Sequence, residues 1–552
     1  MTGRRAAAAL ALAAAAAGAL LLRPDRGVSP FERAMTETSR GAFFQEDGAT
    51  VRGTRLFPSP LEFSRAKPPG VKRVFIVGES AAAEFGAENA LPLPEVLGRL
   101  YSGPRFEVLN LGVPGYDSAR ALAVARAAAA YSPDLLLVMS GNNEYYQDSS
   151  WLDRVPGLNG SAALKRALER LFRRRSPDYA ERMRRYEANL RAIAQTARGA
   201  GAAAAFCTLP ANAADYPPDA RASLAWRNAD FAAGMLALER GRLRTADTRL
   251  AAAAKALPSD ALPAFWHGRV MTARGRWDEA RADYLRALEL DSRPGSRSPD
   301  SRAALVRAAT AQEGAVLIDL AAAFSARAQH GALGAEVMLN GVHWHRRLNP
   351  AASTTMARAL EQAGLWKQSL APEAARRAAW RALDARVAAA AADRAALPAS
   401  YWRQALCRYA LLDQPEWHDP TVAVFQTIAR GGGGELRSLE SFAAYRAALE
   451  PLSCRAPGES DQALKGKWPG VLAHGGEAYR RLDRRRDAWA LFGAARREGY
   501  ATPALWRSLT LLADRDGDAA AREASLQELS ARDAEEAAAL RTALAEKEES
   551  AR

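Results

Sequence analysis

The sequence predicts an α/β fold in which a five-stranded parallel sheet, with helices on both faces, is joined to all-helical repeats. Five short apolar segments alternate with helical patterns between residues 71 and 319. Strands that are apolar throughout and separated by helices are typical of a parallel sheet covered on both sides. A second pattern, helical with a 34-residue period, predicts a module of another kind. At 552 residues the chain is also too long for one ordinary hydrophobic core.

The predicted strands are short, and helical segments separate them. Patterns such as "SARALAVARAAAAY" and "DYAERMRRYEANLRAIAQTARGA" fill the intervals. Cys207 lies in the fourth strand, where we expect it in the core. The five strands span residues 71–77, 106–110, 134–139, 202–208 and 315–319.

The N-terminus has the pattern of an export signal. "MTGRR" is positively charged, and an apolar run follows from Ala6 to Leu22. By the positive-inside rule, Arg4 and Arg5 stay in the cytoplasm and the rest of the chain is exported. We therefore expect residues 1–27 to be a signal anchor or a cleaved signal peptide, with an alanine-rich soluble helix as the alternative. Residues 28–70 lack steady periodicity and are expected to be a linker and approach segment.

The gap between the fourth and fifth strands contains a repeat over residues 211–299. "FAAGMLALERGRLRTADTRLAAAAKAL" and "FWHGRVMTARGRWDEARADYLRALEL" superimpose at an offset of 34 residues. This period, with small residues where paired helices touch, resembles the tetratricopeptide repeat, whose stacked helix pairs form a concave binding surface. A protein partner is therefore expected there, and a plain helical hairpin is the alternative. The matched positions are Phe231 and Phe265, Gly234 and Gly268, Gly241 and Gly275, Ala246 and Ala280, and Ala253 and Ala287.

The region from 366 to 552 is helical by pattern. "AYRRLDRRRDAWALFGAARREGY" and "LWRSLTLLADRDGDAAAREASL" are similar to degenerate repeats of the same type. The last 25 residues predict a charged terminal helix that frays at its end.

Charge and cysteine content exclude several classes of function. The net charge of +14 is spread among acidic residues along helical stretches, a pattern typical of solvated helix faces rather than of a nucleic-acid site. There is no CxxC, no HExxH and no cluster of histidines, so we expect no metal and no organic cofactor. Three cysteines give no disulfide framework, and the sequence leaves open whether Cys407 and Cys454 pair in an oxidising compartment.

Polar residues follow four of the predicted strands. The stretch "VFIVGESAAAEFG" places Ser80 where the first strand meets a helix. "LNLGVPGYDS" ends the second strand, "SGNNEYY" the third, and "LNGVHWHRRLNP" follows the fifth. The carboxyl ends of parallel strands lie at one edge of a sheet, so a nucleophile, oxyanion donors and a histidine would meet there. The nucleophile elbow G-x-S-x-G is absent, because Ala82 occupies its second glycine position.

Taken in order, these segments resemble the blocks of the SGNH (GDSL-type) hydrolases. "GES" is similar to the first block, "NLGVPG" to the second, "SGNNE" to the third and "NGVH" to the last. The resemblance covers residues 71–210, as the first part of the hydrolase domain, and 300–365, as its final part. "TLPANAADYPP" also resembles a segment of bacterial members that carry tetratricopeptide repeats. An SGNH-hydrolase-like sheet is therefore implied.

The resemblance implies a role for each site residue. Ser80 would be the nucleophile, and its own N–H would join the Gly115 backbone and the Asn143 side chain in an oxyanion hole. His343 would be the general base; His345 fits the spacing less well. The alternative interpretations are structural: Ser80 as a helix cap, Gly115 and Asn143 as turn residues, and His343 as a surface histidine.

Two residues depart from the pattern of the family. Glu79 replaces the aspartate of the first block, which takes no part in the reaction. Asn340 replaces the catalytic aspartate, and an amide can hold an imidazole but cannot stabilise an imidazolium by charge. A backbone carbonyl or another carboxylate, such as Asp319, would then have to orient His343. Asp319 is expected mainly to cap the helix that follows it.

The predicted function is hydrolysis of an acyl or acetyl ester through a Ser80 acyl-enzyme. The enzyme would be anchored in the inner membrane and face the periplasm or exterior, or be secreted if the signal is cleaved. Its substrate would be an ester-bearing envelope glycan or lipid. The first alternative is an envelope polysaccharide O-acetyltransferase or deacetylase; the second is a non-catalytic scaffold, which Asn340 favours.

Overall fold

The computed structural model describes most of the chain outside its termini and two long internal segments. The described residues lie within 43–144, 179–218, 223–291, 297–392 and 461–549, with a few positions inside these ranges excepted and four positions added between 417 and 426. They fall into two compact units. One is built within Met1–Ala83 and Glu107–Ala204, and the other within Glu84–Phe106, Ala205–Cys454 and Ser460–Arg552. No helix of the described part is long and apolar enough to cross a bilayer, and the predicted signal, 1–27, lies outside that part.

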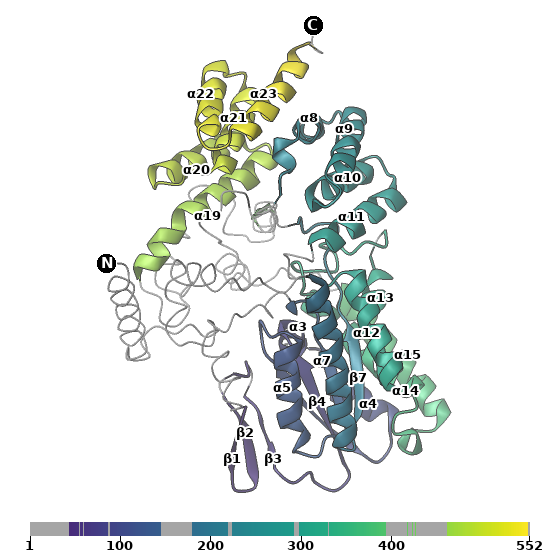
Figure 1. Cartoon of the computed structure of the whole chain (residues 1–552). Helices are drawn as coiled ribbons and strands as arrows, with labels where there is room; N and C mark the ends of the chain where they lie inside the picture. Colours follow the sequence, from purple (N-terminus) through teal and green to yellow (C-terminus); the bar gives the residue numbers. More distant parts are fainter. Residues whose placement is uncertain are drawn as a thin grey trace, which may run out of the picture. The chain divides into compact units, whose positions relative to one another are not determined.

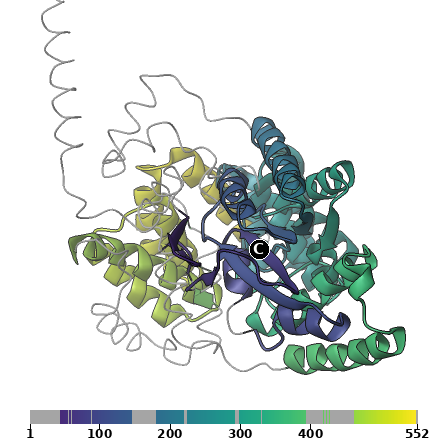
Figure 2. The ribbon, with the colours of Figure 1, turned by 90° about the horizontal axis from the view of Figure 1, so that it is seen from below.

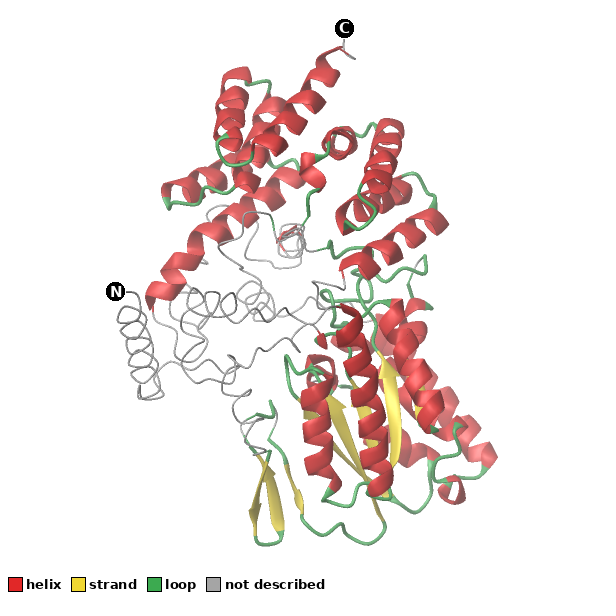
Figure 3. Cartoon of the chain, in the orientation of Figure 1, coloured by secondary structure: helices red, strands yellow, loops and turns green. Residues whose placement is uncertain are grey.

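The five predicted strands form one sheet. They are β4 (Val71–Gly78), β5 (Arg105–Gly112), β6 (Leu135–Met139), β7 (Ala203–Thr208) and β8 (Val316–Asp319). Their order is β5-β4-β6-β7-β8, and β4 pairs in parallel with β6, as β7 does with β8. Figure 3 colours the strands yellow and the helices beside them red. All five residues of β6 are buried, as an apolar run in a covered sheet requires. Burial in β7 raises the pKa of the Cys207 thiol, which therefore stays protonated in the core.

Helices with small apolar residues cover the strands. In the first unit α5 (Ser118–Ala129) contacts β4 and lies beside α7 (Tyr179–Gly199) (Figure 1). In the second unit α12 (Asp300–Glu313) and α14 (Asn349–Gln362) contact β8, and α4 (Leu93–Leu100) and α15 (Glu373–Ala392) contact α14. Buried alanines such as Ala121 and Ala125 let α5 pack closely.

A second, three-stranded sheet lies in the segment that was expected to be a linker. β1 (Phe44–Asp47), β2 (Thr50–Gly53) and β3 (Glu62–Ser64) pair antiparallel in that order. Phe44 and Phe63 each stack edge-on against Tyr131, at 5.2 and 5.3 Å between ring centroids. Strands of three or four residues are too short for a periodic signal, so the aromatic contacts, and not the local pattern, determine this sheet.

The helical regions form hairpins with one recurring contact. The hairpins are α8 (Ala229–Glu239) with α9 (Leu243–Ala256), α10 (Ala261–Ala273) with α11 (Trp277–Asp291), α19 (Asp461–Arg481) with α20 (Arg485–Arg497), and α21 (Pro503–Asp516) with α22 (Ala519–Ser530). In three of them a glycine of the first helix faces a large side chain 16 residues later. An added Cβ would lie 2.6–2.9 Å from that side chain, so each site requires glycine. The pairs are Gly234 with Leu250, Gly268 with Tyr284, and Gly476 with Phe492.

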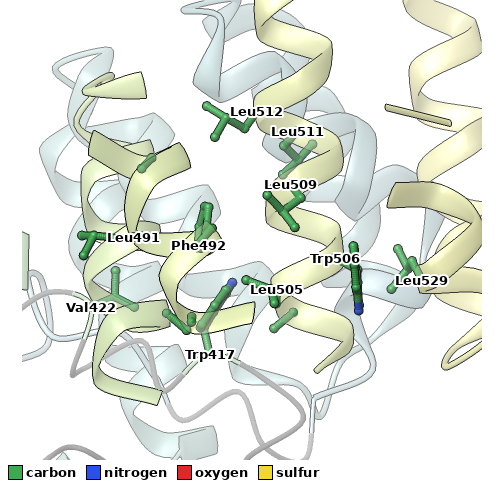
Figure 4. Close-up of a cluster of buried hydrophobic side chains, with 14 of the residues drawn as sticks. Trp417, Val422, Leu491, Phe492, Leu505, Trp506, Leu509, Leu511, Leu512 and Leu529 are labelled. Atoms are coloured by element: carbon green, nitrogen blue, oxygen red, sulfur yellow. The ribbon is translucent and has the colours of Figure 1, made fainter. Parts of the chain in front are cut away.

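The C-terminal hairpins and the inserted hairpins share a core. The last helix, α23 (Ala534–Glu549), contacts α22 on one side and α8 on the other. Ala232 and Leu236 of α8 belong to the same apolar cluster as Trp417, Phe492 and the leucines of α21, part of which Figure 4 shows. Figure 2 shows the C-terminal helices, coloured yellow-green to yellow, gathered in one group. The helices thus follow the spatial order α19 to α23 and then α8 to α11.

The terminal helix α23 is packed along much of its length, and the last three residues of the chain, where fraying was expected, lie outside the described part. Leu540 and Leu544 of α23 are buried in the shared core. Arg249 of α9 also pairs with Glu546 at 2.7 Å. The charged pattern of this helix conceals an apolar stripe whose partner in α8 lies about 300 residues earlier in the sequence.

Candidate active site

Ser80 lies directly after the end of β4. It begins the short helix α3 (Ser80–Phe85), and the residue is buried. The Glu79 N–H donates to the Met139 carbonyl at 3.1 Å, which joins the end of β4 to the end of β6. A Cβ added to Gly78 would lie 2.0 Å from the Met139 oxygen, so only glycine permits this approach. Ser80 is thereby held at the carboxyl end of its strand.

A buried carboxylate connects the neighbour of Ser80 to the loop that carries Asn143. Glu79 is 0% exposed. Its two oxygens accept the backbone N–H groups of Asn142 at 3.0 Å and Asn143 at 3.1 Å. Hydrogen bonds to an ionised carboxylate are stronger than those between neutral groups. The residue that departs from the family's first block therefore holds the third block in place, a role that the sequence did not reveal.

Asn143 and Gly115 lie on the loops that follow the two strands beside β4. The Asn143 side chain is buried, and its Nδ2 donates to the Tyr116 carbonyl at 3.1 Å. A primary amide carries two hydrogens, so this bond does not exhaust its donors. Gly115 has φ of 81°, in the left-handed region that favours glycine. The structure therefore brings Ser80, Gly115 and Asn143 to adjacent strand ends of one unit.

The first turn of α3 is held against β5. A Cβ added to Gly112 would lie 2.3 Å from the Ala83 nitrogen, so the helix backbone rests directly on the strand. Asn110 donates from Nδ2 to the Ala82 carbonyl at 2.7 Å, and its Oδ1 accepts the Gly112 N–H at 2.9 Å. The first glycine of "NLGVPG" thus serves close packing rather than catalysis.

Glu144 is a second buried carboxylate on the same side of the site. It accepts the Ser118 N–H at 3.0 Å and the Ser118 hydroxyl at 2.8 Å, at the beginning of α5. Asn189 of α7 donates to the same hydroxyl at 3.0 Å. Sequence analysis did not single out Glu144, although it directly follows Asn143. It connects the asparagine loop to the helices that cover β4.

His343 and Asn340 form a contact in the second unit. Both residues are buried. The Asn340 Oδ1 accepts the backbone N–H groups of Val342 and His343, each at 2.9 Å. His343 Nδ1 lies 2.9 Å from Asn340 Nδ2 and 3.2 Å from Oδ1. Asn340 therefore contacts Nδ1 of the His343 ring.

The hydrogen bonds of Asn340 favour one tautomer of the His343 ring. The Asn340 Oδ1 already accepts two backbone N–H groups. If the amide were rotated by 180°, its NH₂ group would point at those N–H groups, and two donors would face each other. The NH₂ group is the nearer of the two amide groups to His343 Nδ1, which favours Nδ1 as an acceptor. A neutral ring with an accepting Nδ1 carries its proton on Nε2. A general base needs the opposite tautomer, with the lone pair on Nε2.

Glu84 lies on the other side of the ring. Its Oε1 is 3.7 Å from His343 Nε2, and its side chain is 31% exposed. Glu84 belongs to α3, one turn after Ser80. The sequence did not single out this residue, and the only available signal was its i+4 spacing from the serine.

His345 and Asp319 are engaged elsewhere. His345 Nε2 donates to the Ala335 carbonyl at 2.7 Å, and burial lowers the pKa of this ring. Asp319 caps α13 (Leu320–Ser325) by accepting the Ala322 N–H at 3.1 Å, and it pairs with Arg307 at 2.9 Å. Its capping role is confirmed, and these bonds occupy the carboxylate that was offered as an orienting group for His343.

A buried arginine supports the histidine loop from the inserted hairpins. The Asn212 N–H donates to the Gly341 carbonyl at 3.0 Å. Arg297 is 3% exposed and donates to the carbonyls of Asn212 at 2.7 Å and Tyr216 at 2.5 Å. Asp291, the last residue of α11, binds the same guanidinium at 2.5 Å. "TLPANAADYPP" is thus the segment through which the inserted module supports the loop of His343.

Metal-ligating side chains do not gather in the described part of the chain. Within it, no group of three or more His, Cys, Asp or Glu side chains is arranged to hold a metal ion. Cys407 and Cys454 lie outside the described residues, so their pairing stays open.

Comparison with known proteins finds distant structural similarity. No family model matches the chain, and no curated protein matches it. A catalytic mutant of Axe2, an acetylxylan esterase from Geobacillus stearothermophilus, is similar over 53% of this chain and 94% of its own, at 13% identity and a TM-score of 0.27. TesA is similar over 53% of this chain and 99% of its own, at 15% identity and a TM-score of 0.25. At these values the similarity carries no conclusion about the activity of this chain.

Proposed function

We propose that this chain is a serine esterase of the SGNH type. The observation that carries the proposal is the pair of hydrogen bonds from the Asn142 and Asn143 backbone to Glu79. These bonds hold the segment that carries Ser80 against the segment that carries Asn143. A nucleophile at a strand end and its oxyanion donor must be held in fixed positions relative to each other. The order of the four blocks along the chain supports the same chemistry.

The reaction proceeds in two halves. The Ser80 oxygen attacks the ester carbonyl while its proton passes to His343 Nε2, and the carbonyl electrons move onto the oxygen. The Ser80 N–H, the Gly115 N–H and Asn143 Nδ2 stabilise this oxyanion. His343 then gives its proton to the leaving oxygen as the ester bond breaks. Water repeats the sequence on the acyl-enzyme and releases the acid.

Asn340 makes this enzyme slow. The base requires a proton on Nδ1, which Asn340 Oδ1 accepts only in competition with two backbone N–H groups. In serine proteases an Asp-to-Asn change at this role lowers turnover about 10⁴-fold through the wrong tautomer. We therefore propose a low turnover rather than a lost activity.

The remaining parts of the proposal rest on the sequence. The substrate is an acyl or acetyl ester on an envelope glycan or lipid. Residues 1–27 anchor the chain, with its bulk outside the cytoplasm. The 34-residue hairpins are of the tetratricopeptide type and bind a protein partner. A phosphatase fused to the C-terminus in a bacterial host should be active, and a reporter that works only in the cytoplasm would contradict this topology.

A fluorophosphonate probe tests the proposed nucleophile. Purified residues 28–552 should be labelled on Ser80, and the adduct is mapped by mass spectrometry. Ser80→Ala should abolish labelling and leave the circular dichroism spectrum unchanged.

The contrary outcome is equally clear. An adduct on another serine, or none under conditions that label a control hydrolase, would make Ser80 a helix cap. The chain would then be the non-catalytic scaffold that Asn340 favours.

A further inference from the structure

We propose that Glu84 supplies the negative charge that Asn340 cannot give to His343; this inference rests on the proposed esterase function. The carboxylate of Glu84 lies 3.7 Å from Nε2, within the range of an ion pair. It reaches the ring from the side opposite to Asn340, which contacts Nδ1. The site would therefore hold its carboxylate at the other nitrogen of the histidine.

The position of Glu84 follows from the helix that carries it. Ser80 and Glu84 are four residues apart in α3, so their side chains emerge on the same helix face. Side chains in a helix lean toward its N-terminus, which directs Glu84 toward the turn that holds Ser80. A carboxylate at this position thus faces the nitrogen that receives the serine proton.

The charges around the ring explain why such a carboxylate matters. Asn340 presents a neutral amide to Nδ1, and a neutral group does not offset the charge of an imidazolium. The His343 side chain is 7% exposed and that of Glu84 is 31% exposed, and partial burial strengthens a charge interaction. A negative charge there stabilises the protonated ring relative to the neutral one.

The proposed step balances without a further reactant. In the tautomer that carries its proton on Nδ1, the Ser80 O–H bond breaks and its proton forms a bond to Nε2. The serine oxygen bonds to the ester carbon at the same time, and the carbonyl electrons move onto the carbonyl oxygen. The ring becomes positively charged opposite the ionised Glu84. When the ester C–O bond breaks, Nε2 returns the proton to the leaving oxygen. Glu84 exchanges no proton in this step and acts through His343, as a positioning residue.

A double-mutant cycle with Asn340 tests this role. In the otherwise unchanged protein, Glu84→Gln should lower kcat for a short p-nitrophenyl ester by about 10- to 100-fold, with KM nearly unchanged. In an Asn340→Asp background, the same substitution should lower kcat by less than about 3-fold, because the new aspartate offsets the charge of the ring. A merely structural role of Glu84 would not be rescued by a charge on the opposite side of the histidine.

Two controls make the outcome decisive. Glu62→Gln changes an exposed glutamate of β3 and should leave kcat unchanged. Probe labelling of Ser80 in each variant shows that the nucleophile is in place. If Ser80 is labelled and Glu84→Gln lowers kcat equally in both backgrounds, or in neither, this inference is wrong and the proposed function stands. If Ser80 is not labelled in the unchanged protein, both are wrong.

Discussion

The loop of Asn143 and the loop of His343 are held by opposite chemistry. On the nucleophile side, the buried carboxylates of Glu79 and Glu144 accept backbone N–H groups. On the histidine side, the guanidinium of Arg297 donates to backbone carbonyls. Both arrangements use charge-assisted bonds. The carboxylates belong to the nucleophile side itself, whereas the cation binds the Asn212 segment, which in turn contacts the His343 loop.

The origin of the supporting residues also differs. Glu79 and Glu144 stand beside Ser80 and Asn143 in the sequence, so the nucleophile side carries its own support. Arg297 and Asp291 come from the end of the inserted hairpins. The inserted helices therefore support the segment that contacts the His343 loop, in addition to being joined to the fold by the chain. Five substitutions test how the two sides of the site and the surrounding fold are stabilised.

Asn340→Asp should give the largest effect, because it supplies the histidine loop with the carboxylate it lacks. The aspartate would accept a proton from Nδ1 and place the lone pair on Nε2. We expect kcat for a p-nitrophenyl ester to rise by about 10²-fold or more. Asn228→Asp, at the beginning of α8, is the matched control, because its side chain accepts the Phe231 N–H and aspartate caps equally well. An unchanged rate in an enzyme that depends on Ser80 would contradict the tautomer argument.

Arg297→Met should destabilise the second unit most. It leaves Asp291 buried without its cation, which typically costs about 3–5 kcal/mol. Urea denaturation would measure the loss, and hydrolysis should fall with it because the Asn212 segment loses its donor. Arg286→Met, an exposed site on the same helix as Asp291, should change stability by less than about 0.5 kcal/mol. Equal stability of the two variants would contradict the proposal that Arg297 supports the Asn212 segment.

Glu79→Gln tests the nucleophile side. An amide keeps one acceptor but faces its NH₂ toward the other backbone donor, which costs about 2–3 kcal/mol. Because Asn143 then loses its fixed position, kcat should fall more than KM rises. Steady-state kinetics on the folded variant would show this. A fall in stability without any change in kcat would mean that Glu79 has a purely structural role.

Gly476→Ala tests the contact between α19 and α20. The added methyl group would lie 2.7 Å from the Phe492 ring, so we expect a loss of about 1–3 kcal/mol in stability. Gly493→Ala is the matched control on α20, where the new methyl meets only ordinary contact at 3.5 Å. That variant should be neutral or more stable, because alanine favours helix. Thermal unfolding of both variants would separate crowding from helix propensity.

Acid should weaken the histidine side through Asp319. Burial acts to raise the pKa of Asp319, but hydrogen bonds from Thr208 and Ala322 and the charge of Arg307 outweigh it and lower that pKa. A lowered pKa in the folded state contributes stability above the pKa of the unfolded state, and this stability is lost as pH falls through the folded value. Asp319→Asn should therefore flatten the acid limb of the stability curve. If the free energy of unfolding of the variant falls as steeply with acid as that of the unchanged protein, other carboxylates cause the acid sensitivity.

The sequence by itself determined the local elements. Apolar runs predicted the five strands to within about two residues, because buried parallel strands need continuous hydrophobicity. Ser80 and Asn143 could be placed at strand ends because each directly follows such a run. The 34-residue period marked the inserted hairpins through Gly234 and Gly268, where tight helix contact excludes any side chain.

Tertiary structure alone decided which distant residues meet. Glu84 lies beside His343, and Glu546 pairs with Arg249, although hundreds of residues separate them in the sequence. The β1–β3 sheet and the packing of α23 on α8 were not predicted for the same reason. Periodicity shows that a helix or strand has an apolar face, but it does not show which other helix or strand packs against that face. That choice is made by side-chain packing between elements, a non-local energy that no local pattern records.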